Sequence, residues 1–104
     1  MNIISRNTII YYTEKYPTAK NQLLTWYNEI LKNEFENFNQ LKEMFGSASL
    51  VNNQRVVFNI KGNNFRLVVS FNFLRQTCYT IWFGTHTEYD KINVETIDFD
   101  SNMY

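Results

Sequence analysis

The sequence predicts an α+β protein in which helices come first and a small antiparallel sheet follows. Before Gly46, apolar residues recur at helical spacing. After Gly46 the chain changes to three segments rich in β-branched and aromatic residues, separated by turns. Because helices and strands do not alternate, we expect two or three helices to pack on one face of a three- to four-stranded sheet. A chain of 104 residues forms a single domain.

The first half predicts helices over residues 7–16, 19–33 and 39–45. Asn7 and Thr18 suit the N-caps of the first two helices, and Pro17 separates them. The core-facing residues of the second helix are predicted to be Leu23, Leu24, Tyr27, Ile30 and Leu31, with Trp26 at the flank. Those of the third are predicted to be Leu41, Met44 and Phe45.

The second half predicts strands from "RVVFNI", "FRLVVSFNF" and "CYTIWFGTH". The first turn is "KGNN", in which Gly62 and Asn63 suit positive φ, and the second is "LRQT". A further strand near Leu50 and a short helix over residues 88–94 are compatible with the pattern. The last residues, "DFDSNMY", are predicted to be loose or bound to a partner.

Alternation along the strands assigns side chains to two faces. In the middle strand Phe65, Leu67, Val69, Phe71 and Phe73 are predicted to face the core, and Arg66, Val68, Ser70 and Asn72 the other side. In the last strand Tyr79, Ile81, Phe83 and Thr85 alternate with Thr80, Trp82, Gly84 and His86. If Arg66, Trp82 and His86 share a face, the open side of the sheet carries a cation, an indole and an imidazole.

The composition excludes several classes of protein. Ten basic and ten acidic residues give a formal net charge of 0, so any nucleic-acid contact has to use a local group of cations. The single cysteine, Cys78, permits no internal disulfide, fits a reducing cytoplasm and is expected to be buried in a strand. No membrane span, signal peptide, phosphate loop, metal-ligand set or nucleophile motif is visible, so we expect a cytoplasmic protein without a cofactor.

The remaining chemistry rests on a few titratable and cationic side chains: His86, Glu88, Tyr89, Asp90, Arg66, Arg75 and Lys61. Cleavage of RNA without a metal needs a base, an acid and cations that stabilise the phosphorane, and an exposed ring such as Trp82 can stack a base. The alternatives are structural. His86 can cap a strand end, Arg66 can pair with a carboxylate, Lys61 can be merely solvated, and Tyr89 and Asp90 can start a helix.

Two segments, "RVVFNIKGNNFRLVV" and "GTHTEYDKI", resemble the HigB family of toxins of bacterial type II toxin–antitoxin systems, within the RelE-like superfamily. The resemblance extends over nearly the whole chain. It implies an endoribonuclease that cleaves mRNA, often on the ribosome, and a helix-turn-helix antitoxin of the HigA type that neutralises it. It also implies a compact antiparallel sheet with helices on one face.

By motif position, the resemblance implies a general acid or base at His86 and phosphate contacts at Arg66 and Lys61. It implies an orienting role for Tyr89, and structural roles for Asn63 in the turn and Asp90 at the helix start. Many members carry an arginine where this chain has Ile81, and we expect its loss to weaken activity unless Arg75 compensates. The rival hypotheses are a RelE-like module that binds antitoxin or RNA without cleavage and, with little support, a small-molecule enzyme.

Overall fold

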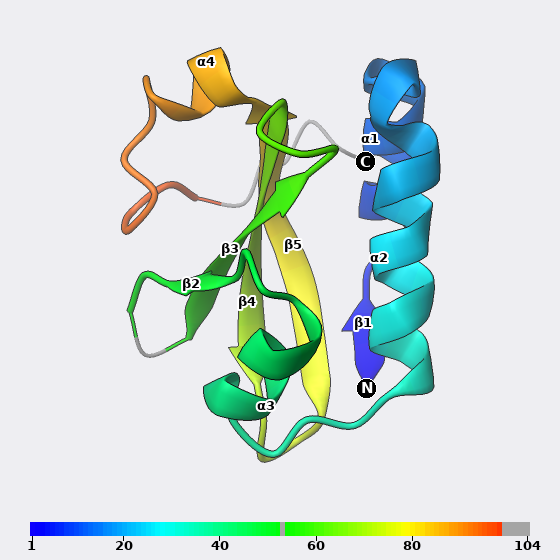
Figure 1. The fold of residues 1–104 in the computed structure, drawn as a ribbon, viewed down its shortest axis with the longest axis vertical. Coiled ribbons are helices and arrows are strands. Elements are labelled where there is room, and N and C mark those ends of the chain that lie inside the picture. Colours follow the sequence, from blue (N-terminus) through cyan, green and yellow to red (C-terminus); the bar gives the residue numbers. More distant parts are fainter. Residues whose placement is uncertain (53, 99–104) are drawn as a thin grey trace.

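The helices of the first half of the chain lie on one face of a five-stranded sheet in the computed structural model, which describes residues 1–52 and 54–98 (Figure 1). The strands lie in the order β1-β5-β4-β3-β2. The predicted α+β class is therefore confirmed, but the sheet has more strands than the three to four expected. No helix within the described ranges is long and apolar enough to cross a membrane.

The strand that the sequence did not predict is β1 (Asn2–Ile4), which pairs in parallel with the start of β5 (Thr77–Thr85). The sheet is consequently mixed, and the prediction of a purely antiparallel sheet was wrong. A three-residue strand is too short to show a period of two. Its partner, β5, lies far away along the sequence, so no local turn indicates that the two strands pair.

The first helices lie close to their predicted positions, with different caps. α1 (Arg6–Lys15) follows Ser5, whose backbone is left-handed with φ 63°, so Asn7 is not the N-cap. Pro17 ends α1 as predicted and opens the 3-10 turn η1 (Pro17–Ala19). α2 (Lys20–Lys32) begins after Ala19, so Thr18 does not cap it either.

Burial on the helices departs from the predicted faces at two positions. On α2, Leu31 is exposed, whereas Trp26, which flanks the predicted face, is buried in the core. α3 (Phe38–Met44) is capped by the Asn37 side chain, which accepts a hydrogen bond from the Gln40 backbone N–H at 3.0 Å. Met44, at the end of α3, is exposed instead of facing the core.

The antiparallel part of the sheet is formed by β2 (Ser49–Leu50), β3 (Arg55–Ile60), β4 (Phe65–Asn72) and β5. β2 confirms the strand near Leu50. In the β3–β4 turn the positive φ values belong to Lys61 and Gly62, not to Asn63. Lys61 therefore takes a conformation that a lysine rarely adopts.

The predicted alternation holds along β4 and fails along β5. Phe65, Leu67, Val69 and Phe71 all lie in the main core beneath the helices, and Phe73 packs against it. In β5 a bulge opposite Val68 and Val69 leaves both Ile81 and Trp82 on the face away from the helices, where Val68 lies. Consequently Trp82 shares a face with Arg66, which is paired in register with Gly84.

The face away from the helices, which we call the outer face, has a small core of its own. Val57, Val68 and Ile81 are buried there, and Val94 and Ile97 from the C-terminal segment pack over them. The Arg55 guanidinium donates hydrogen bonds to the carbonyls of both covering residues, at 3.0 and 2.8 Å. The segment after α4 (His86–Tyr89) is thereby held across the middle of the outer face. Residues 99–104, most of the predicted loose tail, lie outside the described residues.

Candidate active site

The segment that carries the only histidine changes from strand to helix at one residue. β5 ends at Thr85, and α4 begins with His86 rather than at Glu88 as predicted. Thr85 Oγ1 accepts from the Glu88 backbone N–H at 3.1 Å, while Glu88 Oε1 accepts from the Thr85 N–H at 2.9 Å. This reciprocal capping box sets where α4 starts and so places His86 in its first turn.

Glu88 also ties α4 to the helical layer. The Tyr16 hydroxyl, at the end of α1, donates to Glu88 Oε1 at 2.9 Å. The hydrogen bond from the Thr85 backbone, with a further one from Tyr16, lowers the pKa of the Glu88 carboxyl below its usual value. Burial, followed by the contact with Glu88, raises the pKa of the Tyr16 phenol. Glu88 is thus ionised and positioned near neutral pH.

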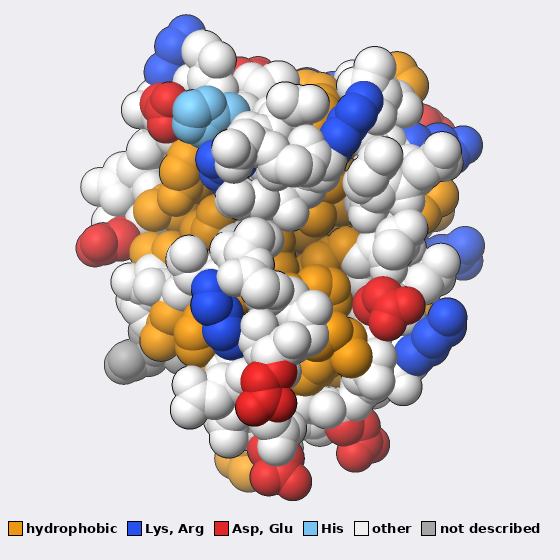
Figure 2. All heavy atoms as spheres, in the orientation of Figure 1, with side chains coloured by type: hydrophobic (Ala, Val, Ile, Leu, Met, Phe, Trp, Pro, Cys, Tyr) orange, Lys and Arg blue, Asp and Glu red, His pale blue; other side chains and the backbone are white. Residues whose placement is uncertain are grey.

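The β3–β4 turn meets α4 directly. The His86 backbone N–H donates to the Asn64 carbonyl at 2.9 Å. The His86 imidazole is about half exposed, and its Nε2 lies 3.7 Å from Asp90 Oδ2 one helical turn later. Such an exposed pair contributes little stability. Figure 2 shows the histidine at the surface, with an acidic and a basic side chain beside it.

Arg66 is a half-buried cation next to this junction. It pairs in register with Gly84, two residues before His86. Its Nη1 donates to the carbonyls of Asn63 and Phe65, each at 3.1 Å. Within residues 1–52 and 54–98, Arg66 forms no ion pair with a carboxylate. Neutral carbonyls hold the guanidinium in place without cancelling its charge, which leaves it able to attract an anion.

Two aromatic rings complete this corner of the outer face. A Cβ atom at Gly84 would lie 2.6 Å from Trp82 Cη2, so the indole lies directly over the glycine. The Trp82 and Tyr89 ring centroids are 6.1 Å apart at an interplanar angle of 50°. Both rings are half-buried and pack against the small outer core. Gly84 therefore places the indole next to the strand position of Arg66.

Two predicted cations lie elsewhere. Lys61 extends toward the helical layer, where its Nζ donates to the Thr18 carbonyl at 3.0 Å, so it does not overhang the outer face. Arg75 lies in the β4–β5 turn at the opposite end of the sheet. The eight residues of β4 separate the two ends by roughly 23 Å, at about 3.3 Å per residue. Arg75 therefore does not join this group.

Ile81 is fully buried in one cluster with Val57 and Val68, so the position at which the family resemblance implies an arginine belongs to an apolar core in this chain. An arginine here would have to bury its charge or displace the covering segment. Asn63 lies in the turn, where its Oδ1 accepts from Asn59 Nδ2 at 3.3 Å and its carbonyl holds Arg66.

Among the other functional groups, the burial of Cys78 was predicted from the sequence, and two sets of contacts were not. Cys78 is buried as expected, and burial raises the pKa of its thiol to about 12. The link between Tyr16 and Glu88 and the contacts of Arg55 were not predicted. The motif T-x-x-E over residues 85–88 is a capping-box signature and was available in the sequence. Nothing local signals the contacts of Tyr16 or Arg55.

The geometry defines a small α+β protein in which a histidine, an arginine and two aromatic rings lie at the same end of the sheet. Residues 19–92 match the sequence model of the HigB toxin family, described as the RelE-like toxic component of a toxin–antitoxin system. The chain belongs to the HigB family of RelE-like toxins, which confirms the resemblance seen in the sequence.

Relatives of similar length support this membership. The mRNA interferase toxin HigB of Escherichia coli (strain K12) is 35% identical over 92 residues, which cover 86% of this chain and 88% of that protein. The mRNA interferase HigB of Shigella flexneri gives the same identity and coverage. The mRNA interferase HigB of Escherichia coli O6:H1 is 27% identical over 94 residues, or 88% and 91% of the two chains.

Proposed function

We propose that this chain is an mRNA interferase, a toxin that cleaves mRNA and so inhibits translation and growth. A HigA-type helix-turn-helix antitoxin neutralises it, and the ribosome presents the substrate. Support comes from family membership and from the names of the relatives. The geometric observation that supports the proposal is that Arg66, Trp82 and Tyr89 lie at the end of the sheet where β5 passes into His86 and α4.

In the proposed mechanism the ribose 2′-hydroxyl attacks the adjacent phosphorus, and the bond to the 5′-oxygen breaks. The products are a 2′,3′-cyclic phosphate and a 5′-hydroxyl. His86 acts as general acid or base, since a neutral imidazole can accept a proton and a protonated one can donate it. Its half-exposed ring in the first turn of α4 leaves it accessible to a nucleotide.

Arg66 supplies the positive charge that a pentacoordinate phosphorane requires. One of its terminal nitrogens is held by the turn carbonyls, so the guanidinium is pre-positioned. Tyr89 orients the phosphate or the base through its hydroxyl, and Trp82 stacks an unpaired base next to it. Lys61 contributes only if it leaves the Thr18 carbonyl, and Asn63 acts by holding the turn.

The test is cleavage of a defined mRNA by purified protein, with and without ribosomes and with and without EDTA. Fragments ending in a 2′,3′-cyclic phosphate, formed in the presence of EDTA, are the expected result. Fragments with 3′-hydroxyl ends, or cleavage that EDTA abolishes, would contradict the mechanism.

A second candidate is a module that binds antitoxin or RNA without cleaving it. Two observations favour it: the net charge of 0, and the apolar Ile81 at the position of a family arginine. The same assay separates the two candidates when RNA binding is measured alongside cleavage. Binding by the wild type without product would favour the module.

A further inference from the structure

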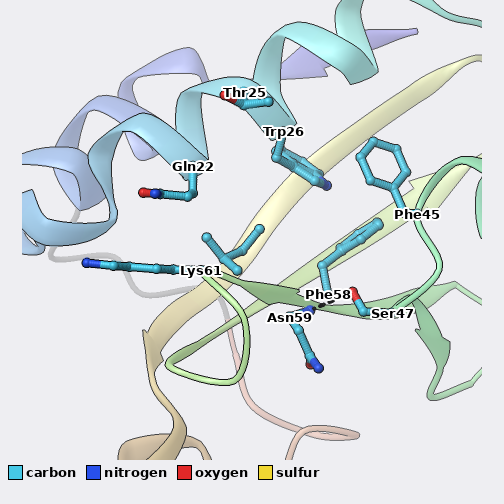
Figure 3. Close-up of a pocket in the computed structure, with 9 residues that line it drawn as sticks. Gln22, Thr25, Trp26, Phe45, Ser47, Phe58, Asn59 and Lys61 are labelled. Carbon is cyan, nitrogen blue, oxygen red and sulfur yellow. Dashed lines mark hydrogen bonds between the residues drawn. The ribbon is translucent and has the colours of Figure 1, made fainter.

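A cavity of about 250 Å³ opens between α2 and β3, on the helical side of the sheet (Figure 3). Trp26, Phe45, Phe58 and Ile60 provide its apolar lining. The aromatic rings are held by edge-to-face packing, with Trp26 and Phe45 both about 5 Å from Phe58 between ring centroids. Because these rings support one another, the cavity is a feature of the packed core.

The Trp26 indole N–H has no hydrogen-bond partner within the described part of the chain. Trp26 is only 3% exposed, and Figure 3 shows its ring nitrogen turned toward the space bounded by Phe45 and Phe58. A buried donor without a partner is destabilising, because it has lost its hydrogen bond to water. An occupant that offers a carbonyl oxygen would remove that destabilisation.

The size of the cavity favours a side chain over a free small molecule. Pockets for small ligands hold roughly 300–1,000 Å³, and this one is smaller and open to solvent on one side. A large apolar side chain anchored to a longer polypeptide gains binding energy outside the cavity as well, so it does not need a larger pocket.

The neighbouring strand edge offers backbone groups to such a polypeptide. β2 pairs only with Val56 and Val57 at the start of β3. Farther along, the Asn59 backbone N–H donates to the Ser47 hydroxyl at 3.2 Å, where a longer strand would have placed a carbonyl. An extended segment added at this edge can replace the hydroxyl with a peptide oxygen.

Charge at the rim specifies the occupant further. Among the residues that the structure describes, Lys61 is the only charged one that lines the cavity, and its ammonium group is exposed and held by a neutral carbonyl. A carboxylate from a partner is a stronger acceptor for that ammonium than the Thr18 carbonyl.

We propose that this cavity is the docking site for the antitoxin. The antitoxin places a large apolar side chain in the cavity, a backbone carbonyl on the Trp26 indole N–H and an acidic residue next to Lys61. The identity of the partner rests on the proposed function. The site lies on the helical side, separate from the corner that carries Trp82 and Tyr89.

The test is the affinity of this chain for the HigA-type antitoxin of the proposed function, measured by calorimetry without RNA. Thr25 is exposed on α2 and lines the cavity, so Thr25→Trp fills it without touching the candidate active site. We expect the dissociation constant to rise about tenfold or more. Leu31→Trp is the matched control, because it adds the same indole to an exposed position of α2 outside the cavity, and its affinity is expected to equal that of the wild type.

Circular dichroism and melting temperature check that both variants fold. Equal affinity of Thr25→Trp and wild type, equal losses in both variants, or no binding by the wild type would overturn the proposal. Weaker RNA binding with unchanged antitoxin affinity would assign the cavity to RNA and also overturn it. If Thr25→Trp weakens antitoxin binding and Leu31→Trp does not, but the wild type cleaves no RNA, the docking site is supported and the nuclease proposal is wrong.

Discussion

The two ends of the sheet each carry an arginine, and the difference between them shows what a phosphate site requires. At the His86 end, Arg66 is half-buried, and the turn carbonyls hold one of its nitrogens next to two packed rings. At the Arg75 end, the arginine is exposed at an open, polar hollow of about 400 Å³. There Asn72 accepts from the Arg75 backbone N–H, not from its guanidinium.

This comparison indicates that residue type alone does not define the site. Both arginines follow or occupy β4, and both carry a full charge. Only Arg66 has its guanidinium pre-positioned by hydrogen bonds, and it pairs in register with Gly84, two residues before His86. A fixed cation loses less side-chain entropy when it binds an anion, which is the reason to place the reaction at the His86 end.

The largest expected effect comes from replacing the imidazole. His86→Ala is expected to slow mRNA cleavage by about 10²- to 10⁴-fold, the usual contribution of a general acid or base. Arg75→Ala is the control at the other end of the sheet and is expected to leave the rate unchanged. The measurement is the single-turnover cleavage rate of the wild type and of both variants. Equal rates for His86→Ala and wild type would remove His86 from the mechanism.

Next in size is the packing of the indole at the His86 end. Gly84→Ala would bring a Cβ atom to within 2.6 Å of Trp82 Cη2 and force the ring away, which is expected to cost about 1–3 kcal/mol of unfolding free energy. Gly46→Ala is the matched control, since nothing lies within 4 Å of a Cβ there. Urea unfolding measures both. A Gly84→Ala protein as stable as the control would mean that the indole position is not constrained.

The geometry of the Arg66 head is tested by a change that keeps its charge. Arg66→Lys is expected to lower the cleavage rate about tenfold, because an ammonium cannot reproduce the planar fork that binds phosphate oxygens. Arg75→Lys serves as the same change at the other end. If both lysine variants cleave at the wild-type rate, charge alone is sufficient and the comparison between the two ends loses its basis.

The smallest expected effect concerns the cap of α4. Thr85→Ala removes the side-chain acceptor of the capping box and is expected to cost about 1 kcal/mol of unfolding free energy. Thr87→Ala, at an exposed position of the same helix, is the control. Unfolding curves of the two variants at neutral pH provide the measurement. Equal stability would show that the cap does not set the start of α4.

The cap also has a pH dependence with a definite sign. The pKa of Glu88 is lowered in the folded state, so its contribution to stability is present above its unfolded pKa and is lost as the pH falls through the folded value. Below about pH 4 the difference in stability between wild type and Glu88→Gln is therefore expected to shrink. A difference that stays constant down to strongly acidic pH would contradict this linkage.

Part of the candidate site was predictable from the sequence. Alternation along β4 placed Arg66 opposite the core residues Phe65 and Leu67, and the structure agrees. The same reasoning placed Trp82 on the side away from Ile81, which was wrong because the β5 bulge leaves both side chains on the outer face. A bulge depends on how two strands register, and one strand's sequence does not contain that information.

The positions of Lys61 and Arg75 relative to the candidate site were not predictable from the sequence. A lysine in a hairpin turn can project to either face, and Lys61 takes positive φ and reaches the helical layer. Arg75 follows a strand whose length sets its distance from His86. That separation becomes evident only when the antiparallel pairing of β4 and β5 is known.

The sequence by itself determined the class of fold, the strands β3 to β5, the face of β4 that enters the core and the presence of a capping box before Tyr89. These features depend on residues close together along the chain, whose spacing reports their periodicity. Only the tertiary structure decided the parallel pairing of β1, the bulge beneath Trp82, the contact of Tyr16 with Glu88 and the cavity beside Trp26. Each of these joins segments distant in the sequence, and such contacts are selected by packing and hydrogen bonding of the whole domain.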